Sequence, residues 1–182
     1  MPRTVDDLLA AHRSGKRIKY VFFWGHRPQR DGGIGTGCLS QWWPSAFTVD
    51  GVRFATAEHY MMWRKALLFG DEEAAGRILA AGHPRQAKML GRRVRGFDEA
   101  AWVAERYEIV VDASVAKFGQ RAELREFLAG TGKRVLVEAS PTDRVWGIGL
   151  AATDEGVGDP ARGRGLNLLG FALMEARGRL SG

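Results

Sequence analysis

The chain has 182 residues, of which 45% are hydrophobic and 26% are charged. A chain of this length can bury about 70% of its unfolded surface, which excludes a wholly disordered protein and a disulfide-dependent mini-domain. The single cysteine, Cys38, excludes an intramolecular disulfide and a cysteine-rich zinc site. No apolar run reaches about 18 residues and the first residues do not form a signal peptide, so we expect a cytoplasmic location and no membrane span.

Basic residues outnumber acidic ones, and the surplus is unevenly distributed. The 27 Lys and Arg residues against 21 Asp and Glu residues give a formal net charge of +6. Residues 1–30 carry seven basic and two acidic side chains, and residues 85–96 carry five basic and no acidic side chains. Such clusters are either solvated faces or binding sites for a polyanion or a phosphorylated ligand. Neither cluster has the interleaved aromatic residues of a single-strand binding groove or a known DNA-reading motif.

The first third of the chain is predicted to contain a helix, a strand and a hairpin. Residues 5–14 favour a short helix, and residues 19–24, rich in aromatic and β-branched side chains, favour a buried strand. Five glycines within residues 25–37 indicate a loop. Residues 48–55 favour a hairpin, because the pair Asp50-Gly51 is a common two-residue turn.

Helices are predicted to dominate the rest of the chain, because helix-capping residues recur before apolar segments. The expected elements are helices from Thr56 to about Phe69, from Asp71 to about Ala81, from Pro84, from Asp98 to about Phe118, around residues 124–128 and over residues 166–180, with a strand over residues 134–139 and a loop over residues 141–165. The few scattered strands predict an α+β fold, a single compact and predominantly helical domain with a small sheet. This domain would span residues 19–182 and follow a basic N-terminal extension with a short helix over residues 1–18.

The segment from Thr56 to Ala66 is the most distinctive candidate for chemistry. Glu58 lies in the first turn of a predicted helix, where the helix dipole favours an ionised carboxylate. Lys65 follows seven residues later, which places it on the same face about 10 Å further along the helix axis. That separation suits a small ligand between the two groups. Alternatively, Glu58 only stabilises the start of the helix.

Two segments near the C-terminus are further candidates. Asp143, Trp146 and two glycines occur within seven residues, a combination that suits a ribose hydroxyl, a stacked base and a close backbone approach. Alternatively, Asp143 forms a turn and Trp146 belongs to the core. Arg162 and Arg164 precede the last helix near Asn167, and backbone amides at a helix start bind anions. This segment lacks the ending of a Walker loop, and Asn167 is alternatively only a helix cap.

Taken in order, the motifs of residues 20–180 resemble the NADAR family, also called the YbiA-like family. The chain departs from the family pattern at Gln41, where the family often has Asn, and in the glycine-rich insert at residues 29–37. The segments that carry the resemblance are Phe23-Trp24, Leu39-Ser40, Thr56 to Tyr60, Lys65-Ala66, Pro84, Ala87-Lys88, Gly91-Arg92, Trp102, Lys117-Phe118, Leu136 to Glu138, Asp143 to Gly147 and Gly165 to Gly170.

The resemblance implies an N-glycosidase that hydrolyses the bond between ribose C1 and a nitrogen, without a metal or cofactor. The implied substrates are ADP-ribosylated guanine in nucleic acid or the early ribosylamino-pyrimidine phosphates of riboflavin synthesis. Cleavage passes through an oxocarbenium-like centre, which a fixed carboxylate can stabilise. The implied catalytic residues are Glu58, Asp143 as a helper and Lys65 through a Schiff base with ring-opened ribose. The implied substrate-binding residues are Trp24, Trp102 and Trp146, with Lys88 and Arg92, or alternatively Arg164 and Asn167, as phosphate ligands.

Two other interpretations remain open at the level of the sequence. One is a non-catalytic module that binds ADP-ribose or a nucleotide, and the other is a basic nucleic-acid-binding protein without a pocket. A nucleotide-like substrate or ADP-ribosylated nucleic acid is the expected partner. If the substrate is a modified base, a functional pairing with a DNA ADP-ribosyltransferase toxin is expected.

Overall fold

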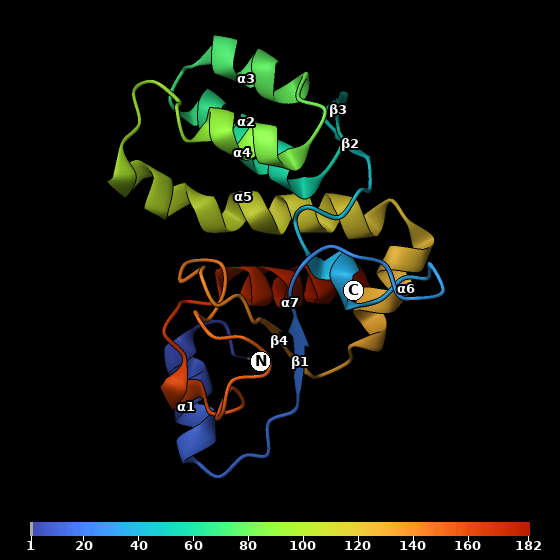
Figure 1. Cartoon of the computed structure of the whole chain (residues 1–182), viewed down its shortest axis with the longest axis vertical. Coiled ribbons are helices and arrows are strands. Elements are labelled where there is room, and N and C mark those ends of the chain that lie inside the picture. Colours follow the sequence, from blue (N-terminus) through green and yellow to red (C-terminus); the bar gives the residue numbers. More distant parts are fainter. Residues whose placement is uncertain (1) are drawn as a thin grey trace. The chain divides into compact units, whose positions relative to one another are not determined.

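The computed structural model describes residues 2–182, so Met1 of the predicted N-terminal extension lies outside the described residues (Figure 1). The fold is α+β and predominantly helical, as the sequence predicts. Contacts within the chain divide it into two compact units. Unit 1 combines the chain up to Ser40 with the chain from Glu123 onward, and unit 2 comprises Gln41–Ala122. Among residues 2–182, no helix is both long and apolar enough to cross a membrane.

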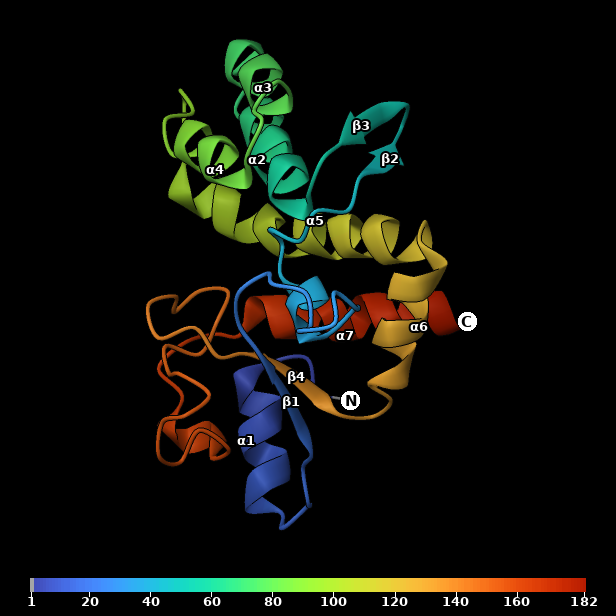
Figure 2. The ribbon, with the colours of Figure 1, turned by 45° about the vertical axis from the view of Figure 1, so that its right-hand side comes forward.

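Unit 1 is built around a parallel pair of strands. Its elements are α1 (Val5–Arg13), β1 (Tyr20–Phe23), the 3-10 helix η1 (Thr36–Leu39), α6 (Ala122–Gly130), which begins at the unit boundary, β4 (Val135–Glu138), the 3-10 helix η2 (Pro160–Arg162) and α7 (Leu168–Ser181). β1 and β4 pair from Tyr20 opposite Val135 to Phe23 opposite Glu138. α7 packs on β4, and α1 packs against η2 (Figure 2).

Asn167 completes the edge of β4 that β1 leaves open. Its Oδ1 accepts a hydrogen bond from the N–H of Glu138 at 3.0 Å, and its Nδ2 donates to the carbonyl of Leu136 at 2.9 Å. The residue is buried and has a left-handed backbone, with φ of 51°. Its side chain therefore replaces a neighbouring strand and sets where α7 begins.

Unit 2 consists of a hairpin followed by four helices. The elements are β2 (Phe47–Val49), β3 (Val52–Phe54), α2 (Ala57–Leu68), α3 (Glu72–Leu79), α4 (Pro84–Gly91) and α5 (Glu99–Gly119). The hairpin turns at Asp50 and Gly51, whose φ angles of 47° and 78° are those of the predicted two-residue turn. Thr56, Asp71 and Asp98 cap α2, α3 and α5, and Pro84 is the first residue of α4, as predicted.

Aromatic packing joins the hairpin to α2. The ring centroid of Phe54 lies 5.0 Å from that of Tyr60 and 5.1 Å from that of Trp63. α2 also packs on α3, α4 and α5 and is therefore the central helix of unit 2. α4 approaches α2 closely because Gly91 has no side chain, and a Cβ there would collide with Met62.

Gly170 and Gly178 lie on the same helix, α7, but in different surroundings. A Cβ at Gly170 would collide with the carbonyl oxygen of Leu136 and with the side chain of Asn167, whereas a Cβ at Gly178 would meet no atom within 4 Å. We expect Gly170→Ala to lower the free energy of unfolding by about 1–3 kcal/mol, because backbone must move. Gly178→Ala should raise it by about 1 kcal/mol through helix propensity. Urea denaturation followed by circular dichroism measures both, and equal shifts would contradict the packing described here.

Candidate active site

Glu58 lies in the first turn of α2, as predicted, and its side chain is only 2% exposed. The N-cap Thr56 accepts a hydrogen bond from the N–H of His59, and the N–H of Glu58 donates to the carbonyl of Gln41 at 3.0 Å. The positive end of the helix dipole favours a carboxylate at this position. The acidic group predicted from the sequence is therefore present in the first turn of α2, and the fold buries it.

His59 fastens this end of α2 to the link between α3 and α4. Its Nδ1 lies 2.8 Å from the hydroxyl of Thr56, and its Nε2 lies 3.0 Å from the carbonyl oxygen of Ala81. A carbonyl only accepts, so Nε2 carries the proton and Nδ1 accepts from Thr56. Burial lowers the pKa of His59 below its ordinary value of 6.5, against the opposing effect of the Ala81 hydrogen bond. The imidazole is therefore neutral and acts as a structural tie.

Lys65 lies at the other end of α2, between two aromatic rings. Its Nζ is 4.2 Å from the ring centroid of Phe97 and 5.3 Å from that of Trp102. Burial lowers the pKa of Lys65, and the charge of Glu99 partly opposes this shift. The structure therefore brings together Lys65 and Trp102, two residues predicted from the sequence. A desolvated amine with a lowered pKa is the form that attacks carbonyl carbon most readily.

Lys88 and Arg92 occupy the last turn and the C-cap of α4. The Nζ of Lys88 lies 5.9 Å from the ring centroid of Trp42, and the edge of that ring meets His83 at a centroid distance of 5.9 Å. Lys88 is half-buried, whereas Arg92 is exposed. Their spacing of four residues puts both on one helix face, as predicted.

The predicted residues of unit 1 are placed by loop hydrogen bonds. Asp143 Oδ1 accepts from the N–H groups of Val145 and Trp146, at 2.9 and 2.7 Å. Asp143 thus shapes the turn that presents the half-buried Trp146. Arg164 is exposed and its N–H donates to Ile148. Both amide atoms of Asn167 bond to β4, as described above.

Trp24 follows β1 directly and is 64% exposed. So large an exposed indole is unusual, because tryptophan is among the most buried residue types on average. The ring of Trp24 is therefore accessible from solvent.

Three further polar or aromatic residues, Gln41, Ser45 and Phe97, were not predicted from the sequence as site residues. Gln41 and Ser45 are buried, and neither Gln41 Oε1 nor Ser45 Oγ has a hydrogen-bond partner within residues 2–182. Phe97 completes the surroundings of Lys65. The departure from the family pattern at Gln41 was a signal, but burial of polar side chains in an irregular segment has no periodicity to reveal it. No group of three or more His, Cys, Asp or Glu side chains in the described part of the chain could hold a metal ion.

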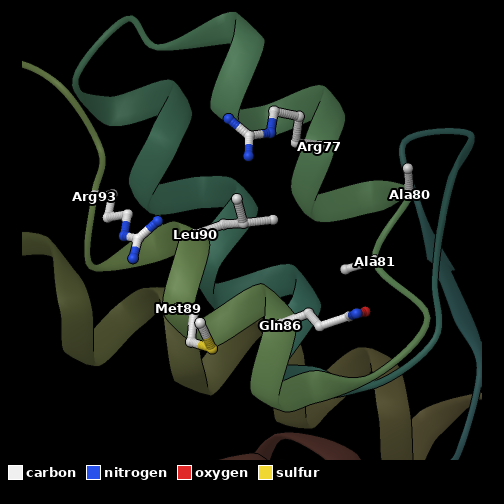
Figure 3. A pocket seen from close by; sticks show the side chains of 7 residues that line it. All are labelled: Arg77, Ala80, Ala81, Gln86, Met89, Leu90 and Arg93. Carbon is white, nitrogen blue, oxygen red and sulfur yellow. The ribbon is translucent and has the colours of Figure 1, made fainter.

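A groove of about 400 Å³ lies on α3, α4 and their link, and it contains none of the predicted residues (Figure 3). Leu90 lies between Arg77 and Arg93, and Met89 and Gln86 line the lower part of the view. Ala81, whose carbonyl accepts from His59, also lines this groove. The hydrogen bond from His59 to Ala81 therefore connects the wall of this groove to the N-terminus of α2.

Comparisons with known proteins agree with the motifs. The family model of the NADAR domain matches residues 22–181. The N-glycosidase R617 of Acanthamoeba polyphaga mimivirus is 41% identical over 165 residues, which cover 87% of this chain and 95% of that protein. The N-glycosidase YbiA of Escherichia coli (strain K12) is 34% identical over 139 residues, which cover 76% of this chain and 77% of that protein. The NMR structure of E. coli YbiA has a TM-score of 0.70 at 29% identity and covers 100% of this chain and 94% of that chain.

The neutral state of His59 predicts a pH-dependent stability. Because the folded pKa lies below 6.5, the unfolded chain takes up the proton first as the pH falls. The stabilisation from His59 is therefore full above pH 6.5 and is lost below it. We expect the difference in free energy of unfolding between the wild type and His59→Asn to shrink from pH 7.5 to pH 5.5. Urea denaturation at both pH values measures this difference. A difference that stays constant would contradict a neutral His59.

Proposed function

The chain belongs to the NADAR domain family, and from this membership we propose that it hydrolyses the ribose C1–N bond of a ribosyl-phosphate or ADP-ribosyl substrate. Membership makes it a hydrolase of N-glycosyl bonds, the activity for which its relatives are named. The observation that carries the proposal is the buried carboxylate of Glu58, held two helical turns before a desolvated Lys65 on α2.

Glu58 supplies the negative charge that the reaction requires. When the C1–N bond breaks, the bonding electrons leave with the base nitrogen and C1 becomes positively charged. A fixed carboxylate stabilises this centre, and it can accept the proton of the water that adds to C1. The products are the free base, protonated at nitrogen, and a ribose with a hydroxyl at C1. Burial strengthens the electrostatic term, because little water screens the carboxylate.

Lys65 offers a second route through its amine. A neutral amine can attack C1 as the C1–N bond breaks, and the base leaves with the bonding electrons and takes up the amine's proton. Opening of the ribose ring then gives an imine between Nζ and C1, and water hydrolyses this imine to release ribose and restore the amine. The position of Nζ between Phe97 and Trp102 desolvates the amine and lowers its pKa, which increases the neutral fraction. Trp102 also presents an aromatic face of the kind on which a leaving base stacks.

The finer assignments follow from the same chemistry. Lys88 and Arg92 on α4 suit the phosphate or pyrophosphate of the substrate, since both side chains share one helix face and Arg95 of the same basic cluster is engaged elsewhere. Asp143 and Trp146 remain candidates for orienting ribose or water and for stacking. The substrate is either ADP-ribosylated guanine in nucleic acid or a ribosylamino-pyrimidine phosphate. The first would fit a functional pairing with a DNA ADP-ribosyltransferase toxin.

Incubation of the purified protein with each substrate class tests the proposal. We expect free base and a reducing ribose product from at least one class, detected by chromatography and a reducing-sugar assay. Binding of ADP-ribose without turnover would instead identify a non-catalytic module. Absence of product from both classes with folded protein would refute the proposed function.

Glu58→Gln keeps the shape of the side chain and removes its charge. We expect kcat to fall by about 100-fold to 10,000-fold while KM changes little, because the carboxylate acts mainly on the transition state. Glu108→Gln on the same unit is the matched control, and it should leave kcat within about twofold. Steady-state kinetics on the accepted substrate measures both, and an unchanged kcat would remove Glu58 from the mechanism.

Lys65→Arg separates the two routes, because it keeps the positive charge and removes the amine that can form an imine. We expect a loss of more than about 100-fold in kcat. In the wild type, borohydride added during turnover should attach a reduced ribosyl group to Lys65, which peptide mass spectrometry detects. If Lys65→Arg keeps its activity and the wild type forms no adduct, the imine route is refuted and water addition assisted by Glu58 is the remaining route.

A further inference from the structure

Seven basic side chains of unit 1 line two cavities that both border α1. The arginine cavity, of about 500 Å³, contains Arg3, Arg144 and Arg164. The lysine cavity, of about 730 Å³, contains Lys16, Arg17, Lys19 and Lys133. All seven side chains are exposed. The basic N-terminal segment, which the family motifs leave unexplained, thus contributes to both cavities.

The arginine cavity is held in shape by the loop that precedes α7. The N–H of Leu166 donates to the carbonyl of Arg144 at 2.9 Å, and the N–H of Arg164 donates to Ile148 at 2.7 Å. Arg144 and Arg164 flank the same glycine, since a Cβ at Gly149 would lie 3.2 Å from Arg144 Cγ and 3.2 Å from Arg164 Cβ. The side chains of Arg144 and Arg164 therefore leave the backbone close together in the wall of the arginine cavity. Their like charges repel each other there.

The lysine cavity depends on the parallel strands. β1 and β4 begin side by side, with Tyr20 opposite Val135 and the N–H of Val135 donating to the carbonyl of Lys19 at 2.9 Å. This register places Lys19 and Lys133 at the same end of the strand pair. Lys16 and Arg17 follow the C-terminus of α1, which forms the opposite wall.

α1 itself is firmly attached to unit 1, so the cations at its ends have defined places. Leu8 is buried, His12 Nε2 lies 3.8 Å from Asp159 Oδ1, and Figure 2 shows α1 beside the segment that contains η2. Thr4 and Asp7 form a capping box at the start of the helix. Arg3 is thereby fixed next to the first turn.

The positive charge of these cavities is not neutralised by ion pairs with described residues of the chain. Within residues 2–182, none of the seven cationic side chains makes an ion pair or donates a hydrogen bond. The only carboxylates in the two linings are those of Asp6 and Asp7, and Asp7 accepts from the backbone N–H groups of Arg3 and Thr4. By contrast, Arg95 of the basic cluster in unit 2 is paired with Asp71 and Glu73. The seven cations around α1 are therefore available to an external anion.

We propose that this surface of unit 1 binds the phosphate backbone of a nucleic acid. Of the two substrate classes proposed above, such a surface favours ADP-ribosylated nucleic acid, and this part of the inference rests on the proposed function. α1 is about 13.5 Å long, a length that corresponds to about four phosphates of one strand. Seven cations distributed along both sides of a helix exceed what one pyrophosphate can use. Guanidinium and ammonium groups on exposed, flexible stems bind backbone phosphate without reading sequence.

Fluorescence anisotropy with an unmodified, labelled 20-nucleotide DNA strand and its duplex tests the proposal. For about four phosphate contacts, we expect affinity to fall about 50-fold for the single strand and about 150-fold for the duplex between 50 and 200 mM salt. Lys16→Ala with Lys133→Ala, and separately Arg3→Ala with Arg144→Ala, should each weaken binding by about tenfold at 50 mM salt. Each pair should also reduce the slope of log K against log salt by about 1.4 for the single strand.

Arg77→Ala with Arg85→Ala is the control, because it removes the same charge from exposed positions of unit 2. An equal loss of affinity in this control would show that net charge alone drives binding, and no measurable binding at 50 mM salt would likewise refute the proposal. Lys16→Ala with Lys133→Ala should leave hydrolysis of a small ribosyl-phosphate substrate unchanged. Since the DNA used is unmodified, its binding is measured whether or not any substrate is hydrolysed, and failure of one proposal is distinguishable from failure of the other.

Discussion

The candidate site of unit 2 depends on a single buried imidazole at the N-terminus of α2. A polar group inside a protein is tolerated when each of its hydrogen-bonding atoms has a partner, and removing one partner costs about 1–3 kcal/mol. His59 meets this condition with Thr56 on one side and Ala81 on the other. Only one neutral tautomer fits both partners. The turn that carries Glu58 is therefore fixed in position relative to the link that leads into α4.

Lys65 represents the opposite energetic situation at the other end of the same helix. An ammonium group loses hydration when it is enclosed by Phe97 and Trp102, and cation–π attraction returns only part of that loss. A lowered pKa is the direct expression of this imbalance. Groups held in such a state are concentrated at functional sites, because the same strain that disfavours the charged form makes the amine reactive. The helix α2 thus carries a carboxylate whose charge the helix dipole favours and an amine whose charge is disfavoured by loss of hydration.

Local chemistry made most of the fold predictable, and non-local contacts account for what the sequence did not reveal. Some structural signals act within a few residues and can be recognised in the sequence. Examples are the N-caps Thr56 and Asp98 and the Asp50-Gly51 turn. Asn167 was readable as a helix start, but its hydrogen bonds to β4 join residues about thirty positions apart. The contact between Lys65 and Phe97 has the same character, since α2 and the segment before α5 meet only in the folded unit. Glu58 and Lys65 were identifiable because helical periodicity relates them directly.

The placement of charge separates two physical tasks. A buried group such as Glu58 lies in a medium of low effective dielectric constant, where its interaction with a neighbouring charge is strong and depends on a fixed geometry. Exposed cations such as Arg3 and Lys133 act through a screened field, whose strength depends on salt and whose direction tolerates a moving partner. One group cannot serve both tasks, because the burial that strengthens its electrostatic effect also makes it inaccessible to a long polyanion. A net charge of +6 is therefore uninformative as a total, and it becomes interpretable once the cations without carboxylate partners are distinguished from those, like Arg95, that an acidic neighbour holds.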